Sequence, residues 1–413
     1  MHTHDVPPRP SETRRGIEWL KNFAPGDDET AQLLLNSLWF VSETIFRQEL
    51  SARLQAVLTD GRVETPAALF SVQSYDPTGG VMFHKPVTPL VSSASSMGSE
   101  LVVQNIIGAT QLSLPTSLAT RGATDPDKLR QRRVRSLVFV SDQAGSGREC
   151  LEYTRTWLRN KTIRSWRSLK LIKLYLVLFT ASTSGLRLLN NSGLYDGIWL
   201  VRHGMDFASA MWDEAQRRKV RSLCERYERR VGEGLGWEGS GGLAVFEHTV
   251  PNNLPSILRQ TKGPSRRPDG WAPFFSYRSA PPDLMRELSG YAPKHDPALG
   301  LRVLGQERLA RAGEMRPRYR SGVRNLAEVL GHIAGGRRHA EQLARAVSVS
   351  VPTAEEIIVQ VRVWGLIDAQ SRLTDAGWAE LRAAKAKPRH VLQQLQGSQE
   401  PYYPCSLRES RWP

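Results

Sequence analysis

The sequence has few cysteines and no long apolar run. The three cysteines among 413 residues, at positions 150, 224 and 405, match no metal-binding spacing. This argues against a structural zinc site and favours a reducing compartment, so we expect a cytoplasmic protein. The longest apolar run, Leu174–Phe179, is far too short to cross a bilayer. The polar, proline-rich start does not resemble a signal peptide. We therefore predict a soluble protein without a membrane partner.

Acidic residues are outnumbered by basic ones. The chain has 56 Lys and Arg against 41 Asp and Glu, which gives a net charge of +15. Such a charge favours polyanionic partners, although a solvated basic surface explains it as well. A basic hinge around Tyr319 is the densest cluster, and we predict that it binds nucleic acid through Arg316, Arg318, Arg320 and Arg324. Trp157 and Trp166 lie in a second basic stretch, either as stacking surfaces or as core residues of an ordinary helix.

Apolar runs alternate with helical segments between residues 67 and 246. An amphipathic helix or helix pair is expected first, over Glu29–Leu58. The runs that we interpret as strands are Ala67–Val72, Leu137–Val140, Leu171–Phe179, Gly197–Val201 and Leu243–Phe246. This order predicts an α/β fold with a Rossmann-like, mostly parallel sheet and helices on both faces. Ligands of such sheets bind at the carboxyl ends of the strands, where Asp142, His203 and His248 fall.

The stretch Ser136–Cys150 reads as a buried strand, a glycine turn and the start of a helix. Ser141 and Asp142 follow the apolar part of the strand, and Gly145, Ser146 and Gly147 form the turn. Glycines let backbone N–H groups approach an anion, and the helix N-terminus adds partial positive charge. Asp142 is then placed to hold hydroxyls or a metal ion, and Arg148 to contact a phosphate. A merely tight structural turn is the alternative.

A second loop of small polar residues, Ser92–Glu100, also enters a predicted helix. It contains Ser96, Gly98 and Ser99, and Ser99 is a suitable N-cap. A serine and glycine loop at a helix start is a possible anion cradle. A surface loop without a ligand is the other interpretation.

Two motifs together resemble a known family. The strand, acid and small-residue loop at 137–148 resemble the phosphate-loop signature of type I phosphoribosyltransferases, with Ser141 in place of the first acid. The texts V-P-N-N-L-P at 250–255 and W-A-P-F-F at 271–275 are similar to the phosphoribosyltransferase-like domain of bacterial anti-phage systems, some of which accompany retron reverse transcriptases. The resemblance spans residues 30–278.

The resemblance implies roles for individual residues. Asp142 would be catalytic and hold ribose hydroxyls of phosphoribosyl pyrophosphate (PRPP) or another nucleotide, or a Mg²⁺ ion. The turn residues Gly145, Ser146, Gly147 and Arg148 would bind the 5′-phosphate, and Ser96, Gly98 and Ser99 the pyrophosphate. The base or substrate side would be formed by His248, Asn252 and Asn253. Ser141 would weaken one ribose contact and puts ordinary turnover in question.

Residues 325–385 predict a small α+β winged helix-turn-helix domain. Helices are expected at Leu326–Ile333, at His339–Val347 and from a Thr353 cap to Val363, with a wing strand beginning at Gly365. The text V-x-x-W-G-L-I followed by L-T-x-x-G resembles bacterial winged-helix regulators. Its third helix carries Glu355 and Glu356 at the entry end, which would meet DNA phosphates badly. Binding of protein, or of nucleic acid without sequence reading, remains open.

These observations predict a flexible segment over 1–28, a phosphoribosyltransferase-like domain over 29–278, a basic linker over 279–323, a winged-helix domain over 324–386 and a flexible tail over 387–413. The favoured hypothesis is a toxin-like effector of an anti-phage system, in a larger complex with a small structured RNA or RNA–DNA hybrid and a reverse transcriptase. The alternative is a catalytically inactive, nucleotide-sensing transcriptional regulator. A conventional salvage transferase fits the charge and the winged domain least.

Overall fold

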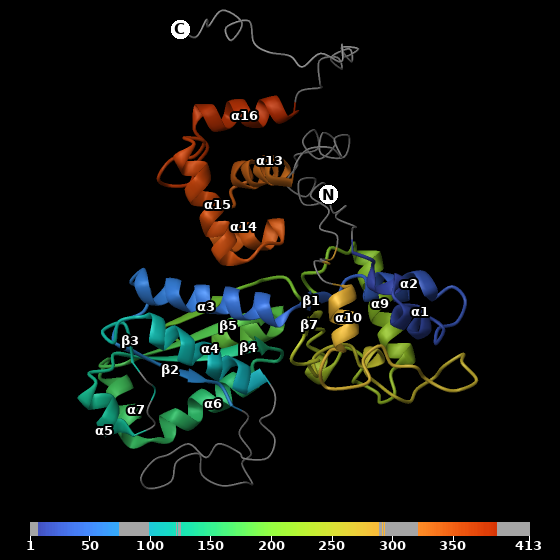
Figure 1. The fold of residues 1–413 in the computed structure, drawn as a ribbon, viewed down its shortest axis with the longest axis horizontal. Coiled ribbons are helices and arrows are strands. Elements are labelled where there is room, and N and C mark those ends of the chain that lie inside the picture. The colour runs from blue at the N-terminus through green and yellow to red at the C-terminus, as the bar shows by residue number, and fades with distance from the viewer. Residues whose placement is uncertain are drawn as a thin grey trace, which may run out of the picture.

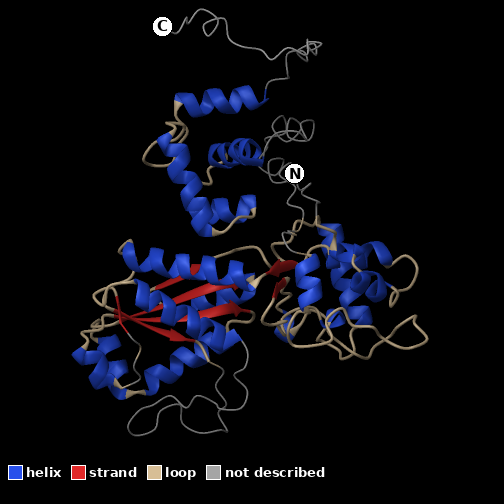
Figure 2. Cartoon of the chain, viewed as in Figure 1, coloured by secondary structure: helices blue, strands red, loops and turns tan. Residues whose placement is uncertain are grey.

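The computed structural model describes residues 7–73, 99–120, 122, 125–288, 291, 293 and 321–385. They form three regions, which Figure 1 shows in chain colours and Figure 2 by element type. A five-stranded sheet with its covering helices is the first region. A helical region lies beside it, around a short two-stranded sheet, and a winged-helix domain lies over helix α3 (Figure 1). No helix in these ranges has the length and apolar character that crossing a membrane requires.

The central sheet is entirely parallel and confirms the predicted α/β fold. Its strand order is β3-β2-β4-β5-β6. The strands span Ala67–Ser71 (β2), Ala119–Thr120 (β3), Ser136–Ala144 (β4), Lys173–Ala181 (β5) and Gly197–Leu200 (β6). The chain runs outward from β2 to β3 and then returns to β4 on the other side of β2. The crevice at such a reversal, beyond the carboxyl ends of the strands, is where ligands of open α/β sheets bind.

Alternate side chains of β4 supply the cores on the two faces of the sheet. Val138 and Val140 pack under helices α3 (Glu43–Thr59) and α4 (Ser99–Ser113). Leu137 and Phe139 pack in the opposite core with Trp157. The helices on that second side are α5 (Pro126–Gln131), α6 (Arg148–Arg159), α7 (Lys161–Ser168) and α8 (Thr183–Asn191). Because both faces are covered, the middle of each central strand is an apolar run, and polar residues appear toward the strand ends.

The helical region has a core of its own. It contains 3₁₀ turns η1 (Pro10–Glu12), η2 (Trp237–Gly239) and η3 (Ser256–Leu258), helices α1 (Arg14–Leu20), α2 (Asp28–Leu35), α9 (Glu214–Tyr227) and α10 (Pro282–Glu287), and strands β1 (Trp39–Val41) and β7 (Ala244–Phe246). The sequence predicts a flexible segment over 1–28, whereas Trp19 of α1 is fully buried and donates its indole N–H to the Ile257 carbonyl at 2.9 Å. The polar, proline-rich composition of the segment conceals this anchor.

Two expectations for this region are corrected by β1. The sequence predicts one helix or a helix pair over 29–58; the structure has the pair, α2 and α3, but places the strand β1 between them, which the sequence does not predict. It also places the Leu243–Phe246 strand in the main sheet, whereas β7 pairs in parallel with β1 in a separate sheet, with Phe40 opposite Val245. The three-residue strand β1 lies inside an apolar pattern that equally suits a helix, so its pairing partner was not visible from the sequence.

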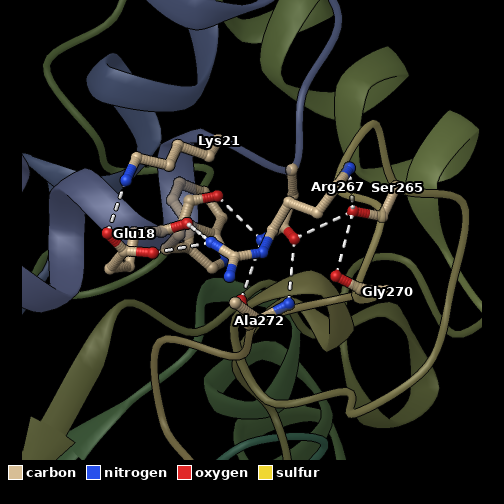
Figure 3. Close-up of polar contacts among 8 residues, drawn as sticks. Glu18, Lys21, Ser265, Arg267, Gly270 and Ala272 are labelled. Atoms are coloured by element: carbon tan, nitrogen blue, oxygen red, sulfur yellow. Dashed lines mark hydrogen bonds and ion pairs between the residues drawn. The ribbon is translucent and has the colours of Figure 1, made fainter.

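The proline-rich stretch near residue 265 is tied to α1, although its composition resembles a linker. Figure 3 shows the contacts: Arg267 Nη1 lies 2.7 Å from Glu18 Oε2, and Ser265 Oγ donates to the side chain of Asn22 at 3.1 Å. Hydrogen bonds from Lys21 and Arg267 lower the pKa of Glu18 to about 2. Ala272 N donates to the same Asn22 side chain at 2.9 Å. The stretch is therefore part of the helical region.

The C-terminal domain is a winged helix-turn-helix. Its helices are α13 (Ser321–Ala334), α14 (Ala340–Val347), α15 (Val351–Val363) and α16 (Asp375–Lys385), and a β-bridge joins Ile367 to Leu373 in the wing. Leu330, Leu343, Ile358 and Leu381 are among its core residues. The third helix is capped by Ser350 rather than Thr353, because the Ser350 hydroxyl accepts a bond from Thr353 N at 3.3 Å.

Candidate functional site

Asp142 lies near the carboxyl end of β4 and is 7% exposed. Its Oδ1 atom accepts hydrogen bonds from Gln143 N at 2.7 Å and from the Ser141 hydroxyl at 3.1 Å. The Ser99 hydroxyl, at the start of α4, also hydrogen-bonds to the carboxylate. Burial raises the pKa of Asp142, and these hydrogen bonds partly oppose that rise. The structure thus brings Ser99 of one predicted loop to the acid of the other.

His248 follows β7 and faces the same carboxyl group. Its Nε2 lies 3.9 Å from Asp142 Oδ2, and its ring centroid is 4.7 Å from that of Phe46 and 5.4 Å from that of Phe246. Burial lowers the pKa of His248 to about 4, so the imidazole is neutral near pH 7. Both ring nitrogens are buried and lack a hydrogen-bond partner among the described residues. A neutral imidazole with unused hydrogen-bonding capacity therefore adjoins Asp142.

The glycine turn has the form that the sequence predicts at the start of α6. Gly147 is the N-cap with φ +80°, a conformation that favours glycine, and no side chain caps the helix. Arg148 points elsewhere: its side chain is 67% exposed, and its Nε lies 3.2 Å from Glu238 Oε2. The turn therefore leaves the N-terminus of α6 without a side-chain cap, whereas Arg148 is paired with an acid.

The two asparagines of the second motif have different positions. Asn253 is buried, its Nδ2 donates to Gln143 Oε1 at 3.3 Å, and its backbone oxygen accepts from Gly242 N at 2.8 Å. Asn252 is exposed, and its carbonyl accepts from Trp237 N at 3.0 Å. The structure thus brings Asn253 to the end of β4 and leaves Asn252 on the surface.

Several buried polar atoms near the strand ends have no partner. They are Asn253 Oδ1, Thr180 Oγ1 and the ring nitrogens of His248, within the ranges that the structure describes. Thr180 is opposite Gln143 in the β4–β5 pair. Buried polar groups are nearly always hydrogen-bonded, so these atoms indicate a place for water or a polar ligand. Sequence reasoning missed Thr180, although a lone threonine at the end of an apolar strand is a usable signal.

The side chains at the strand ends include one carboxylate, Asp142, that suits a Mg²⁺ ion. No group of three or more His, Cys, Asp or Glu side chains capable of holding a metal occurs in the described ranges. Mg²⁺ is often held by one or two carboxylates, with substrate phosphates and water completing its octahedron. Asp142 fits such a single-carboxylate role, with Oδ2 as the oxygen that faces His248 rather than Ser141.

Some predicted residues lie outside this geometry. Ser96, Gly98, Arg316, Arg318 and Arg320 fall outside the described residues, and for Arg324 only the backbone, within α13, is described. Trp157 is fully buried in the sheet core, so the structure rules out the stacking surface at that position. Arg130 covers the Trp166 ring at 5.3 Å from its centroid.

The winged helix contacts the α/β domain through a buried arginine that sequence reasoning missed. Arg53 of α3 is 0% exposed, and its Nη1 lies 3.2 Å from Glu355 Oε1, while Glu341 lies 3.6 Å from Nη2. Arg62 also contacts Glu355, at 2.8 Å. Val351 N donates to the Val201 carbonyl at 2.7 Å. Glu355, one of the two acids at the start of the third helix, therefore faces the α/β domain.

A pattern in the sequence marks Arg53 in retrospect. It lies in the apolar stripe of α3, three residues after Leu50 and four before Val57, where a long charged side chain is unexpected. A buried charge needs a partner, and here the partner comes from residues about 300 positions away. No local pattern could identify it.

Two family models match the chain. A model described as PRTase-CE matches residues 17–276, and one described as wHTH-PRTase associated matches residues 327–409. No curated protein and no solved structure matches. The first match covers the sheet region and all of the helical region except η1, the start of α1 and α10, and the second begins within α13.

Proposed function

Because the chain belongs to the PRTase-CE family, with a phosphoribosyltransferase-like domain and an associated winged helix-turn-helix domain, we propose that it acts on a ribosyl phosphate. The observation that carries the proposal is the cluster at the strand ends. Buried Asp142 lies 3.9 Å from neutral His248 and beside the uncapped N-terminus of α6. A ribose needs a hydroxyl acceptor, and its 5′-phosphate needs N–H donors; this cluster contains both.

The proposed reaction exchanges one bond at ribose C1′. The bond from C1′ to pyrophosphate or to a base breaks, and its electron pair leaves with that group. The acceptor, a base or water, forms the new bond and releases a proton. The reacting carbon passes through a cation-like state, which fixed anionic and dipolar groups stabilise. Asp142 holds the ribose hydroxyls, the Gly145–Gly147 turn holds the 5′-phosphate, and His248 hydrogen-bonds the ligand. Mg²⁺, when bound to Asp142, would neutralise phosphate charge.

We further propose that this chemistry makes the chain a toxin-like effector of an anti-phage system, associated with a retron. A net charge of +15 supports a nucleic-acid partner, a small structured RNA or RNA–DNA hybrid held with a reverse transcriptase. The docking of the winged helix on α3 supports a silent complex from which a phage trigger releases the effector.

One observation favours a second candidate. Ser141 replaces the first acid of the motif and donates its hydroxyl to Asp142, which removes one ribose contact and uses part of the other. A site of this kind suits a nucleotide sensor that has lost turnover. The chain would then regulate transcription through its winged helix in response to a bound nucleotide.

The test compares Asp142→Asn with Asp127→Asn, an exposed acid paired only with Arg130 among the described side chains. Each variant is expressed with its genomic neighbours, and toxicity and phage protection are measured. We expect Asp142→Asn to abolish both and Asp127→Asn to keep both. Retention of both activities by Asp142→Asn overturns the assignment. Release of base or pyrophosphate from nucleotides and PRPP, measured with purified protein, separates the effector from the sensor.

The partner is tested by purification with and without nuclease. A chain expressed natively with its neighbours is expected to carry nuclease-sensitive RNA or RNA–DNA hybrid at moderate salt. A preparation free of nucleic acid contradicts the complex and favours the nucleotide sensor, because the positive charge would then be only a solvated surface.

A further inference from the structure

A pocket of about 290 Å³ lies where the winged helix meets the carboxyl ends of β5 and β6. One wall is formed by Thr183, Arg187 and Asn190 of α8, another by His203 and Ser209, and α14 contributes Arg345. A larger pocket of about 860 Å³ shares His203, Ser209 and Arg345 with it. Neither pocket is lined by Asp142 or by the Gly145–Gly147 turn. This joint is therefore distinct from the site at the end of β4.

The smaller pocket carries positive charge that the described residues do not neutralise. Among the described residues, neither Arg187 nor Arg345 of this lining forms an ion pair with a carboxylate, and Arg345 donates to the Ser209 hydroxyl at a long 3.4 Å. The neighbouring Asp206 is 2% exposed and accepts bonds from Thr183 N and Ser209 N, so its charge is directed at the start of α8. Two unpaired guanidinium groups suit a phosphate group.

His203 adds a hydrogen-bonding group to the same wall. Its Nε2 is buried and lacks a partner among the described residues. Burial, aided by Arg345 and Arg53, lowers the pKa of His203 to about 4. The imidazole is thus neutral and repels neither a cation nor an anion. A ligand in the joint would supply the hydrogen bond that Nε2 lacks.

The larger pocket is lined by aromatic rings whose positions are fixed. The Trp212 indole N–H donates to Ser37 Oγ at 2.9 Å, and the Tyr291 hydroxyl donates to the Asn36 carbonyl at 2.6 Å. Trp39 completes the aromatic lining. Its volume falls in the range of small-molecule sites, which are mainly apolar with a few placed polar groups. Rigid aromatic walls of this kind accept a planar ring.

We propose that this joint binds a mononucleotide, with its phosphate between Arg187 and Arg345 and its base in the aromatic pocket. The phosphate is held by α8 from the α/β domain and by α14 from the winged helix. The ligand therefore bridges the two domains and favours their docked arrangement. Because Asp142 does not line it and the ligand joins two domains, we assign this site a regulatory and not a catalytic role.

Equilibrium dialysis against radiolabelled AMP tests the proposal. Every protein is the full chain with Asp142→Asn, which weakens binding at the β4 end. We expect saturable AMP binding, and we expect Arg345→Gln or Arg187→Gln to weaken it about tenfold or more, as the loss of a charge-assisted hydrogen bond predicts. Arg338→Gln, a change of an exposed arginine on the same domain, is expected to leave binding unchanged.

Adenosine and inorganic phosphate separate the two halves of the ligand. Each should compete with AMP more weakly than unlabelled AMP does. Equal competition by phosphate alone overturns the base pocket, and equal competition by adenosine overturns the phosphate pocket. Absence of saturable binding, or identical binding by Arg345→Gln and Arg338→Gln, overturns the site. Melting temperatures of the variants near that of the parent confirm that the comparison concerns folded proteins.

Discussion

Two neighbouring strands of the sheet, β4 and β5, each lead through a short turn into a helix. The two helices differ in how the backbone N–H groups at their N-termini are capped. At α6 the N-cap is Gly147, and no side chain caps the helix. At α8 the N-cap is Ser182, whose hydroxyl accepts from Gly185 N at 2.9 Å, and the Asp206 carboxylate accepts from Thr183 N. One helix start is left for a ligand, and the other is satisfied by the protein.

We call the turn before α6 the open turn and the turn before α8 the closed turn. The closed turn supports the open turn. The Ser182 hydroxyl donates to the Gly145 carbonyl, so the closed turn holds the open one in place. A Cβ atom at Gly185 would lie 2.4 Å from the Gly145 oxygen, which shows how closely the two backbones approach. An anion cradle must be rigid to bind through backbone N–H groups, and packing against a capped neighbour provides that rigidity.

The largest loss of stability is expected at the contact between the winged helix and α3, where Glu355 pairs with Arg53. Glu355→Gln removes the nearer carboxylate partner of buried Arg53 and leaves Glu341, at 3.6 Å and half exposed. The half-exposed Glu341 compensates the buried charge of Arg53 only in part, and breaking a buried ion pair costs several kcal/mol, so we expect a loss of about 3 kcal/mol in unfolding free energy. Denaturant unfolding monitored by tryptophan fluorescence measures it.

Glu356→Gln is the matched control, because Glu356 is the exposed neighbour on the same helix. We expect it to change stability by less than about 0.5 kcal/mol. The double variant Arg53→Met with Glu355→Gln should recover part of the loss, since an apolar side chain no longer needs a partner. Equal effects of Glu355→Gln and Glu356→Gln would show that the two domains do not dock in this way.

The next effect tests the close approach of the two turns. Gly185→Ala places a Cβ atom 2.4 Å from the Gly145 oxygen and 2.8 Å from the Ala144 oxygen, and neither backbone atom can yield as a flexible side chain would. We expect a loss of roughly 2 to 3 kcal/mol in stability, together with weaker phosphate binding. Gly108→Ala is the control: its Cβ would meet no described atom within 4 Å, and alanine favours the helix. Equal melting temperatures of the two variants would contradict the packing.

The lowered pKa of His248 predicts that the stability of the folded chain depends on pH. The pKa of His248 is about 4 in the folded chain, below its ordinary 6.5, so the unfolded chain binds more protons between these values. Stability therefore falls as pH falls through that window, and the loss between pH 7 and pH 5 should be about 2 kcal/mol. His248→Gln should remove this part of the pH dependence, measured by denaturant unfolding at both values. An unchanged slope would show that folding does not lower the pKa of His248.

The open turn was predictable from the sequence, whereas the closed one was not. The apolar run before Asp142 and the spaced Gly145 and Gly147 identify a strand, a turn and a helix start locally. The support of that turn comes from Ser182 and Asn253, which are 37 and 108 residues beyond Gly145 in the chain. The parallel sheet is predicted by the alternation of strands and helices along the chain, whereas the pairing of β1 with β7 depends on three-residue strands without a distinct pattern.

The ion pair of the winged helix is another long-range contact that the sequence alone does not predict. Gly365 and the apolar spacing predict the helices of this domain close to where the structure has them, and the sequence also shows that its third helix is acidic at the entry end. The partner that explains Glu355, Arg53, lies about 300 residues earlier in α3. Sequence patterns report which side chains are unusual, and only the fold reports which of them meet.

The smallest effect compares one serine from each turn. Ser182→Ala removes the cap of α8 and the bond to the Gly145 carbonyl, and we expect a stability loss of about 1 kcal/mol. The Ser146 hydroxyl makes only a long contact, 3.4 Å from Arg148 N, so Ser146→Ala should change stability by less than about 0.5 kcal/mol. The order reverses for the ligand, because Ser146 lies in the cradle itself. Calorimetric titration with PRPP should show affinity falling about threefold to tenfold for Ser146→Ala. If Ser146→Ala instead costs as much stability as Ser182→Ala and leaves affinity unchanged, both turns are structural and the cradle at α6 is not a phosphate site.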